Sequence, residues 1–249
     1  MELTPFHLQV TENLTVAGEC VGNETSGRVV IFSHGFGVRR DSRGMFTQLG
    51  SVLESDFLVV RFDYDSIDQE RKKNFVHPYH VQTIILDKVI AFISQTFFHP
   101  EINIVAHSQG CFIVGLAQLP HIHRVILNSS PTASPYERVV ERLQQRNPTG
   151  YKQSGVNVFP RSDGSTTYFD AEFWPEMKAI RPTELYTQLA NITDLWFIRA
   201  LNDEIVTDGQ YDALRRNANL HYLEIPGNHN FSDDGDRKNW LVTIKSILQ

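Results

Sequence analysis

The most informative part of this sequence is Asn103-Ile104-Val105-Ala106-His107-Ser108-Gln109-Gly110. Apolar residues that suit a buried strand run directly into a small-His-Ser-Gln-Gly turn, and a helical pattern follows. A turn this tight between a strand and a helix needs small residues two before and two after the serine, here Ala106 and Gly110. The pattern predicts that the Ser108 hydroxyl is held at the carboxyl edge of a sheet, at the N-terminus of a helix.

Strands and helices are predicted to alternate on both sides of this turn. After an antiparallel pair at His7–Val10 and Leu14–Val21, the expected strands are Val29–Ser33, Phe57–Phe62, Ile102–Ala106, Arg124–Asn128, Leu195–Ala200 and His221–Ile225. The expected helices are Arg43–Glu54, Val81–Phe98, Gln109–Leu116, Gly209–Ala218 and Arg237–Leu248. This alternation is typical of an α/β fold with a mostly parallel central sheet and helices on both faces.

The interval Thr132–Thr193 interrupts the alternation, and it is far longer than the usual connection of about 4–6 residues. It is rich in aromatic residues, and its expected elements are a helix at Pro135–Gln145 and a hairpin of Asn157–Phe159 and Ser165–Phe169 across Asp163-Gly164. We therefore predict that residues 1–131 and 192–249 form the core of one domain. Residues 132–191 are predicted to form an inserted cap, or lid.

A second motif, Ser33-His34-Gly35-Phe36-Gly37, ends an early predicted strand. Acyl transfer builds negative charge on a carbonyl oxygen, and backbone N–H groups must already point at that oxygen. A His-Gly-x-Gly turn supplies one such donor, and the residue after the nucleophile supplies the other. The backbone amides of Phe36 and Gln109 are therefore the candidate oxyanion hole, with an ordinary glycine-rich turn as the alternative interpretation.

Two loops late in the chain carry groups that could activate Ser108. A serine hydroxyl is a weak nucleophile that needs a base, and the base needs a carboxylate to orient it. Asp203 and His229 each follow a predicted strand, so both belong to the same carboxyl edge as Ser108. Glu204 and Asp208 are alternative candidates for the acid. The acid usually lies a few residues past the end of a strand, and Asp203 fits this position best.

The order Ser108, Asp203, His229 is that of the α/β-hydrolases, and the chain resembles this superfamily along nearly its whole length. Within the superfamily it is similar to bacterial carboxylesterases of the feruloyl (cinnamoyl) esterase type. The resemblance rests on the position of the cap and on the motifs His34-Gly35-Phe36, Arg61-Phe62-Asp63-Tyr64, His107-Ser108-Gln109-Gly110, Asn202-Asp203-Glu204-Ile205-Val206 and Gly227-Asn228-His229. The chain departs from that pattern at Ala106, where Gly is usual, and at Asp65-Ser66-Ile67-Asp68, where Gly-His-Gly-x-Ser is common.

The resemblance implies an α/β-hydrolase fold with Ser108 as nucleophile, His229 as base and Asp203 as acid, and with Phe36 and Gln109 as oxyanion amides. The implied reaction is hydrolysis of a small-molecule carboxylic ester through an acyl-Ser108 intermediate, with no cofactor and no metal. A thioesterase or peptidase with the same triad stays an alternative. A non-catalytic binding module on the same fold is a further one.

Four further side chains are candidates for substrate contact: His34, His107, Phe169 and Trp174. The structural alternatives are that His34 holds the glycine-rich loop, that His107 packs the elbow, and that the two aromatic residues form the core of the cap. His121 and His123 are two apart, but the sequence offers them no third ligand, so no metal site is predicted.

The composition excludes several classes of protein. The 249 residues are 41% hydrophobic and 21% charged, which is typical of a globular chain. A net charge of −6 without a basic stripe argues against a nucleic-acid partner. No membrane span and no signal peptide are predicted. The chain has only two cysteines, Cys20 and Cys111. This low number, together with the lack of a predicted signal peptide, favours a cytoplasmic protein with reduced thiols. The sequence makes no prediction of the oligomeric state.

Overall fold

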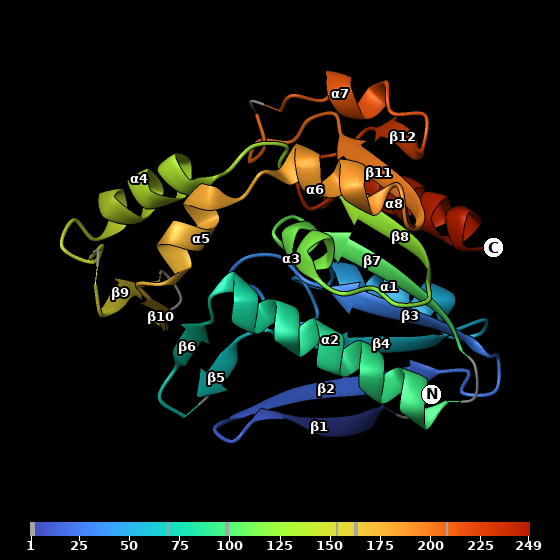
Figure 1. The fold of residues 1–249 in the computed structure, drawn as a ribbon, viewed down its shortest axis with the longest axis horizontal. Helices are drawn as coiled ribbons and strands as arrows, with labels where there is room; N and C mark the ends of the chain where they lie inside the picture. The colour runs from blue at the N-terminus through green and yellow to red at the C-terminus, as the bar shows by residue number, and fades with distance from the viewer. Residues whose placement is uncertain (1–2, 69, 98–99, 153, 162–163, 208) are drawn as a thin grey trace.

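The computed structural model describes residues 3–249 except residues 69, 98–99, 153, 162–163 and 208. Its centre is an eight-stranded sheet in the order β1-β2-β4-β3-β7-β8-β11-β12 (Figure 1). The strands are β1 (Thr4–Thr11), β2 (Leu14–Gly22), β3 (Arg28–Ser33), β4 (Leu58–Phe62), β7 (Glu101–His107), β8 (Ile122–Asn128), β11 (Asp194–Ala200) and β12 (Leu220–Ile225). All neighbours from β4 to β12 run parallel, and β1 and β2 run antiparallel at one edge.

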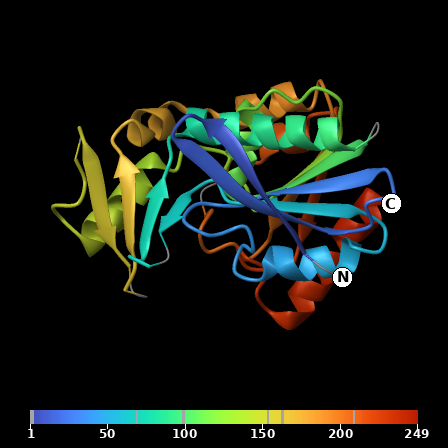
Figure 2. The same ribbon diagram turned by 90° about the horizontal axis from the view of Figure 1, so that it is seen from below.

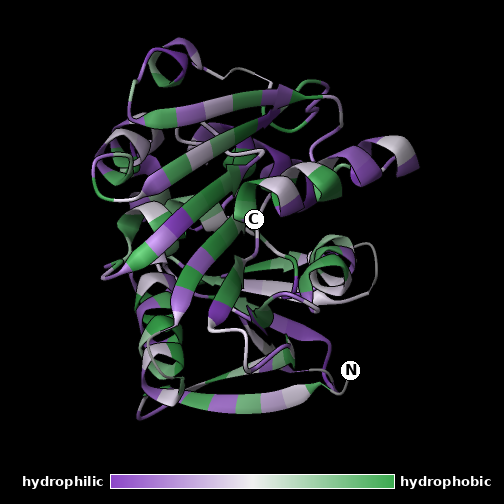
Figure 3. Cartoon of the chain, turned by 90° about the vertical axis from the view of Figure 1, so that its right-hand side faces the viewer, coloured by the Kyte–Doolittle hydropathy of each residue, from purple (hydrophilic) through white to green (hydrophobic). Residues whose placement is uncertain are grey.

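Helices cover both faces of this sheet (Figures 1 and 2). One face carries α2 (Tyr79–Thr96), α3 (Gly110–Leu116) and α6 (Pro182–Leu189), and the other carries α1 (Met45–Leu53) and α8 (Asp234–Leu248). Along β3, Val29 and Ile31 belong to the first core, whereas Val30 and Phe32 belong to the second. Successive side chains of a strand point to opposite faces, so a strand covered on both faces is apolar throughout. Figure 3 shows such hydrophobic segments along the middle strands.

A second, four-stranded sheet lies at one end of the molecule (Figure 2), and we call it the small sheet. Its order is β5-β6-β10-β9, with β5 (Ser66–Asp68), β6 (Lys73–Val76), β9 (Val156–Pro160) and β10 (Thr166–Asp170). The hairpin of β9 and β10 was predicted, although Asp163 of its turn lies outside the described residues. The sequence did not predict β5 and β6, which follow β4 directly. Parallel pairing of β6 with β10 joins them to the interval 132–191.

Two helices of that interval pack around the small sheet, whereas α6 of the same interval lies on the central sheet. Helix α4 (Tyr136–Arg146) contacts β9 and α5 (Phe173–Ala179), and α5 also contacts α2. The aromatic rings of Phe159, Phe169, Phe173 and Trp174 are buried there and contact one another. This end of the molecule therefore has an aromatic core that is continuous with the core under α2 and α3.

The predicted α/β architecture and the opening antiparallel pair are confirmed, but one helix is wrong. Of Gly209–Ala218, only Asp212–Arg215 is helical, as α7. The backbone N–H of Gln210 donates to Thr132 Oγ1 at 2.7 Å, and the Asn217 side chain accepts from the backbone N–H of Asn219 at 3.0 Å. These bonds compete with the helix at both ends. Phe98, the predicted end of α2, lies outside the described residues.

Among the helices that the structure describes, none combines the length and the apolar character needed to cross a membrane.

Candidate active site

Ser108 lies in a strained turn between β7 and α3. Its φ is +55°, a left-handed conformation that a residue with a side chain rarely adopts. Its backbone N–H donates to the Asn128 carbonyl at 3.0 Å, which ties the turn to the end of β8. A Cβ at Gly110 would stand 2.3 Å from the Ser33 carbonyl oxygen, so only glycine fits there. The small residue expected after the serine is thus required by the close approach of β3.

The glycine-rich loop after β3 passes directly over this turn. A Cβ on Gly35 would lie 3.1 Å from Ser108 Cβ. The buried His34 ring fixes the loop through two hydrogen bonds. Its Nδ1–H donates to the Gly35 carbonyl at 2.9 Å, and its Nε2 accepts from the Tyr64 backbone N–H at 2.9 Å. Burial lowers the pKa of His34, which matches these roles of a neutral ring. The loop therefore has a fixed position above Ser108.

His229 and Asp203 form a buried hydrogen-bonded pair. His229 Nδ1 donates to Asp203 Oδ2 at 2.8 Å, and both side chains are almost fully buried. The other oxygen, Asp203 Oδ1, accepts the backbone N–H groups of Ile205 at 2.8 Å and Val206 at 2.7 Å. Burial alone would raise the pKa of Asp203, but the bond and charge attraction from His229 and the two N–H groups hold this pKa below its usual value. Asp203 is therefore an ionised partner of the imidazole.

The neighbouring acid Glu204 contacts His229 differently. Its Oε2 accepts the backbone N–H of His229 at 3.1 Å, so it supports the loop and not the ring. Asp208, the third candidate acid, lies outside the described residues. Of the candidate acids that the structure describes, Asp203 is the one that bonds the imidazole.

His107, next to the serine, holds the histidine loop. Its Nε2–H donates to the His229 carbonyl at 2.9 Å, and the two rings lie 4.9 Å apart between centroids. Burial, helped by repulsion from His229, lowers the pKa of His107 to about 3, so this ring is neutral at physiological pH. The elbow and the histidine loop are thus joined through His107, a bond that the sequence did not predict.

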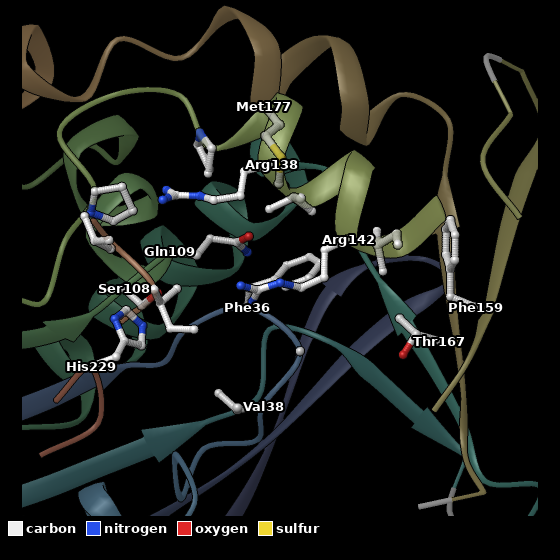
Figure 4. Close-up of a pocket in the computed structure, with 18 of the residues that line it drawn as sticks. Phe36, Val38, Ser108, Gln109, Arg138, Arg142, Phe159, Thr167, Met177 and His229 are labelled. Atoms are coloured by element: carbon white, nitrogen blue, oxygen red, sulfur yellow. The ribbon is translucent and has the colours of Figure 1, made fainter. Parts of the chain in front are cut away.

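A cavity of about 260 Å³ opens onto these residues (Figure 4). Figure 4 shows the His229 ring beside Ser108. Of the predicted site residues, the cavity brings together Phe36, His107, Ser108, Gln109, Phe169 and His229. Asp203 lies behind His229. His34 and Trp174, both expected to contact substrate, are not part of the wall: His34 holds the loop, and Trp174 packs on Phe169 in the aromatic core, with 5.2 Å between ring centroids.

The cavity wall also contains residues that the sequence did not single out. Part of it is apolar, including Phe112 and Val139, and part is basic, with Arg138 and Arg142 from α4 (Figure 4). The spacing of four between these arginines, continued by Arg146, is the sequence signal that could have identified them, because such residues share one face of a helix.

Comparison with known proteins supports the fold. No family model matches the chain, and no curated protein matches it either. Solved structures match over nearly its whole length. The structure of Est1E from Butyrivibrio proteoclasticus with ferulic acid bound is 15% identical, with a TM-score of 0.73 and coverage of 98% of this chain and 97% of that one.

Two further structures agree with this. The esterase domain of a Rhodothermus marinus protein is 16% identical, with a TM-score of 0.69 and coverage of 99% and 98%. The alpha/beta hydrolase GrgF from Penicillium sp. sh18 is 11% identical, with a TM-score of 0.70 and coverage of 100% and 98%. Likeness at such low identity establishes the fold, and the chain has the α/β-hydrolase fold.

Proposed function

We propose that this chain is a serine hydrolase that cleaves carboxylic esters through an acyl-Ser108 intermediate. The observation that carries the proposal is the 2.8 Å bond between His229 Nδ1 and Asp203 Oδ2, buried beside the cavity that Ser108 lines. Because the ring donates its Nδ1–H to Asp203, its Nε2 is free to accept a proton. The left-handed Ser108, at φ +55°, matches the nucleophile turn of this fold.

In the proposed reaction, His229 removes the proton of Ser108 as the oxygen attacks the ester carbonyl. The backbone N–H groups of Phe36 and Gln109 stabilise the resulting oxyanion. His229 then returns the proton to the leaving alcohol, and the acyl group stays on Ser108. Water repeats the sequence, with its proton taken by His229, and releases the acid. Asp203 orients the ring and stabilises its cation throughout.

We further propose that residues 1–131 and 192–249 supply the chemistry, and that residues 132–191 act as a cap that selects the substrate. Phe159, Phe169 and Met177 come from this interval and line the cavity together with Phe36. Aromatic walls suit an aromatic acyl group, as in a feruloyl ester. That Est1E holds ferulic acid supports this choice by analogy of fold.

The free, buried thiols of Cys20 and Cys111 support the proposed cytoplasmic location.

A fluorophosphonate probe tests the proposal directly. We expect it to label the wild-type protein at Ser108, and to label neither the Ser108→Ala nor the His229→Ala variant. A folded wild-type protein that is not labelled would favour the non-catalytic binding module. Assays with a matched ester, thioester and amino-acid anilide then separate an esterase from a thioesterase or peptidase, because the leaving group is the part that differs.

A further inference from the structure

The wall of the cavity has an unusual charge. The chain as a whole carries a net charge of −6. Its candidate active-site cavity nevertheless has five arginines in its wall: Arg43, Arg138, Arg142, Arg146 and Arg161. Among the described residues that line it, none is aspartate or glutamate. A positive wall of this kind in an acidic protein attracts anions and concentrates them at the site.

Three of these arginines form a row along α4. Arg138, Arg142 and Arg146 are spaced by four residues and share the face of the helix that lines the cavity. Like charges at this spacing repel, by roughly 0.2–0.5 kcal/mol per pair. The acidic residues of the same helix, Glu137 and Glu141, do not line the cavity, so the helix segregates its charges. The repulsion is relieved when an anion lies against the row.

Arg142 and Arg146 are the members of the row that can bind a ligand with least competition. Both are exposed. In the part of the chain that the structure describes, neither forms an ion pair with an acidic side chain. Arg138 already contacts Thr207 Oγ1 at 3.5 Å, and Arg161 donates to the Gly37 carbonyl at 3.0 Å. Figure 4 shows Arg142 extending from α4 across the cavity toward Ser108.

The basic wall continues beyond the cavity. A second hollow shares Gly37, Val38, Arg43 and Arg161 with the first, and adds Arg39, Lys72 and Lys73. Its two carboxylates are Asp41 and Asp68, and Asp68 is paired with Arg71 at 3.2 Å. Positive charge therefore extends from α4 past the glycine-rich loop to the β5–β6 hairpin.

On the basis of the proposed esterase function, we propose that the substrate is an anionic ester, with a carboxylate or phosphate group remote from the bond that is cleaved. Arg142 and Arg146 bind that group. Guanidinium groups bind carboxylate and phosphate through paired, charge-assisted hydrogen bonds. The apolar part of the wall, with Phe36, Val139 and Phe159, contacts the portion between the anion and the ester. The substrate is thus amphiphilic.

Matched pairs of neutral and anionic esters test the inference. The acyl side is tested with mono(4-nitrophenyl) adipate against its methyl-capped diester. The alcohol side is tested with 4-(butyryloxy)benzoate against its methyl ester, and with 4-(butyryloxy)phenyl phosphate against its diethyl ester. Hydrogen bonds to charged groups predict that kcat/KM is roughly 10- to 100-fold higher for the anion in at least one pair. The pair that shows the preference identifies the side of the substrate and separates carboxylate from phosphate.

The Arg142→Gln/Arg146→Gln variant should reduce this preference to within a few-fold of unity, mainly through KM. Glutamine keeps the helix propensity and removes the charge. Arg216→Gln is the matched control, because Arg216 is an exposed arginine directly after α7 that does not line the cavity. The ratio of kcat/KM for the anionic ester to that for the neutral ester should be the same in this variant as in the wild type. The wild-type preference should also fall as NaCl is raised.

The outcomes separate this inference from the function on which it rests. If Ser108 is labelled and neutral esters are hydrolysed without preference for any anion, the inference is wrong and the proposed function stands. A preference that survives in the double variant also overturns the role of Arg142 and Arg146. If Ser108 is not labelled and no ester of the panel is hydrolysed, the proposed function fails, and the inference fails with it.

Discussion

The ring of Phe36 stacks on the ring of Phe169, with 5.4 Å between centroids and 19° between planes. Phe36 belongs to the glycine-rich loop over Ser108, and Phe169 belongs to β10 of the small sheet. Phe173 of α5 also stacks on Phe36, with 5.8 Å between centroids. The loop that carries a proposed oxyanion donor is therefore packed against the segment that lines the candidate active-site cavity.

Replacing Phe169 by leucine should lower kcat roughly 10-fold, because a small displacement of an oxyanion donor costs much of its stabilisation. Leucine keeps most of the buried volume, so the fold is retained. It cannot form the stacked pair with Phe36. The matched control is Phe75→Leu. Phe75 stacks on Tyr168 of the same small sheet, at 4.9 Å, and does not line the cavity. If both variants lose kcat equally, the effect comes from the small sheet as a whole and not from the contact between Phe169 and Phe36.

The three proposed triad residues should act as a unit. Ser108→Ala, His229→Ala and Asp203→Asn should each lower kcat by roughly 10⁴–10⁶, and the double variants should lose little more. Glu204→Gln should be far less damaging, because Glu204 bonds the backbone N–H of His229 and not its ring. Steady-state kinetics on a 4-nitrophenyl ester measure this. If Glu204→Gln costs as much as Asp203→Asn, the assignment of the acid is wrong.

Asn128 should be important for stability, although it does not line the cavity. Its Nδ2 donates to the Ala106 carbonyl at 3.0 Å, and its Oδ1 accepts from Trp240 Nε1 at 2.8 Å. Asn128→Ala removes the side-chain bond to the Ala106 carbonyl and leaves the buried Trp240 Nε1–H without this acceptor, at a cost of roughly 2–4 kcal/mol in the free energy of unfolding. Urea denaturation measures this, with Asn219→Ala on the surface as the control. Combining Asn128→Ala with Trp240→Phe should cost less than the sum of the two, since the orphaned donor is then absent.

Asp65 should make the stability of the protein depend on pH. Burial raises the pKa of this carboxyl to about 7, against a hydrogen bond from Asn74 that lowers it. In the unfolded chain an Asp carboxyl has a pKa of about 3.9. The folded state therefore binds the proton more tightly, and its stability falls as pH rises from about 4 to about 7.

The Asp65→Asn variant should remove this fall, because the amide stays neutral and its oxygen can still accept from Asn74. Above pH 7 the variant should be more stable than the wild type, by an amount on the order of 2–4 kcal/mol. Thermal or urea denaturation across pH 4–8 measures the difference. Parallel pH profiles of the two proteins would show that Asp65 is ionised in the folded state.

The central fold and the order of the proposed catalytic residues can be predicted from the amino-acid sequence alone. The elbow around Ser108 can be identified because its requirements are local: a buried strand, small residues on both sides of the serine, and a helix start. Asp203 and His229 could be located because parallel strands end at one edge of a sheet, and this follows from the alternation of strands and helices. Apolar runs without alternation indicated a sheet covered on both faces.

Which carboxylate bonds the imidazole could be learned from the folded structure and not from the sequence, since Asp203 and Glu204 are adjacent and differ in which atom of His229 they reach. The same holds for the small sheet, where β6 pairs with β10 across about ninety residues of chain, and no local pattern specifies such a pairing. The separation of His34 and Trp174 from the cavity wall, and the gathering of arginines on it, were decided in the same way. Each depends on which face of an element is turned toward Ser108, and that is settled by the packing of distant segments against one another.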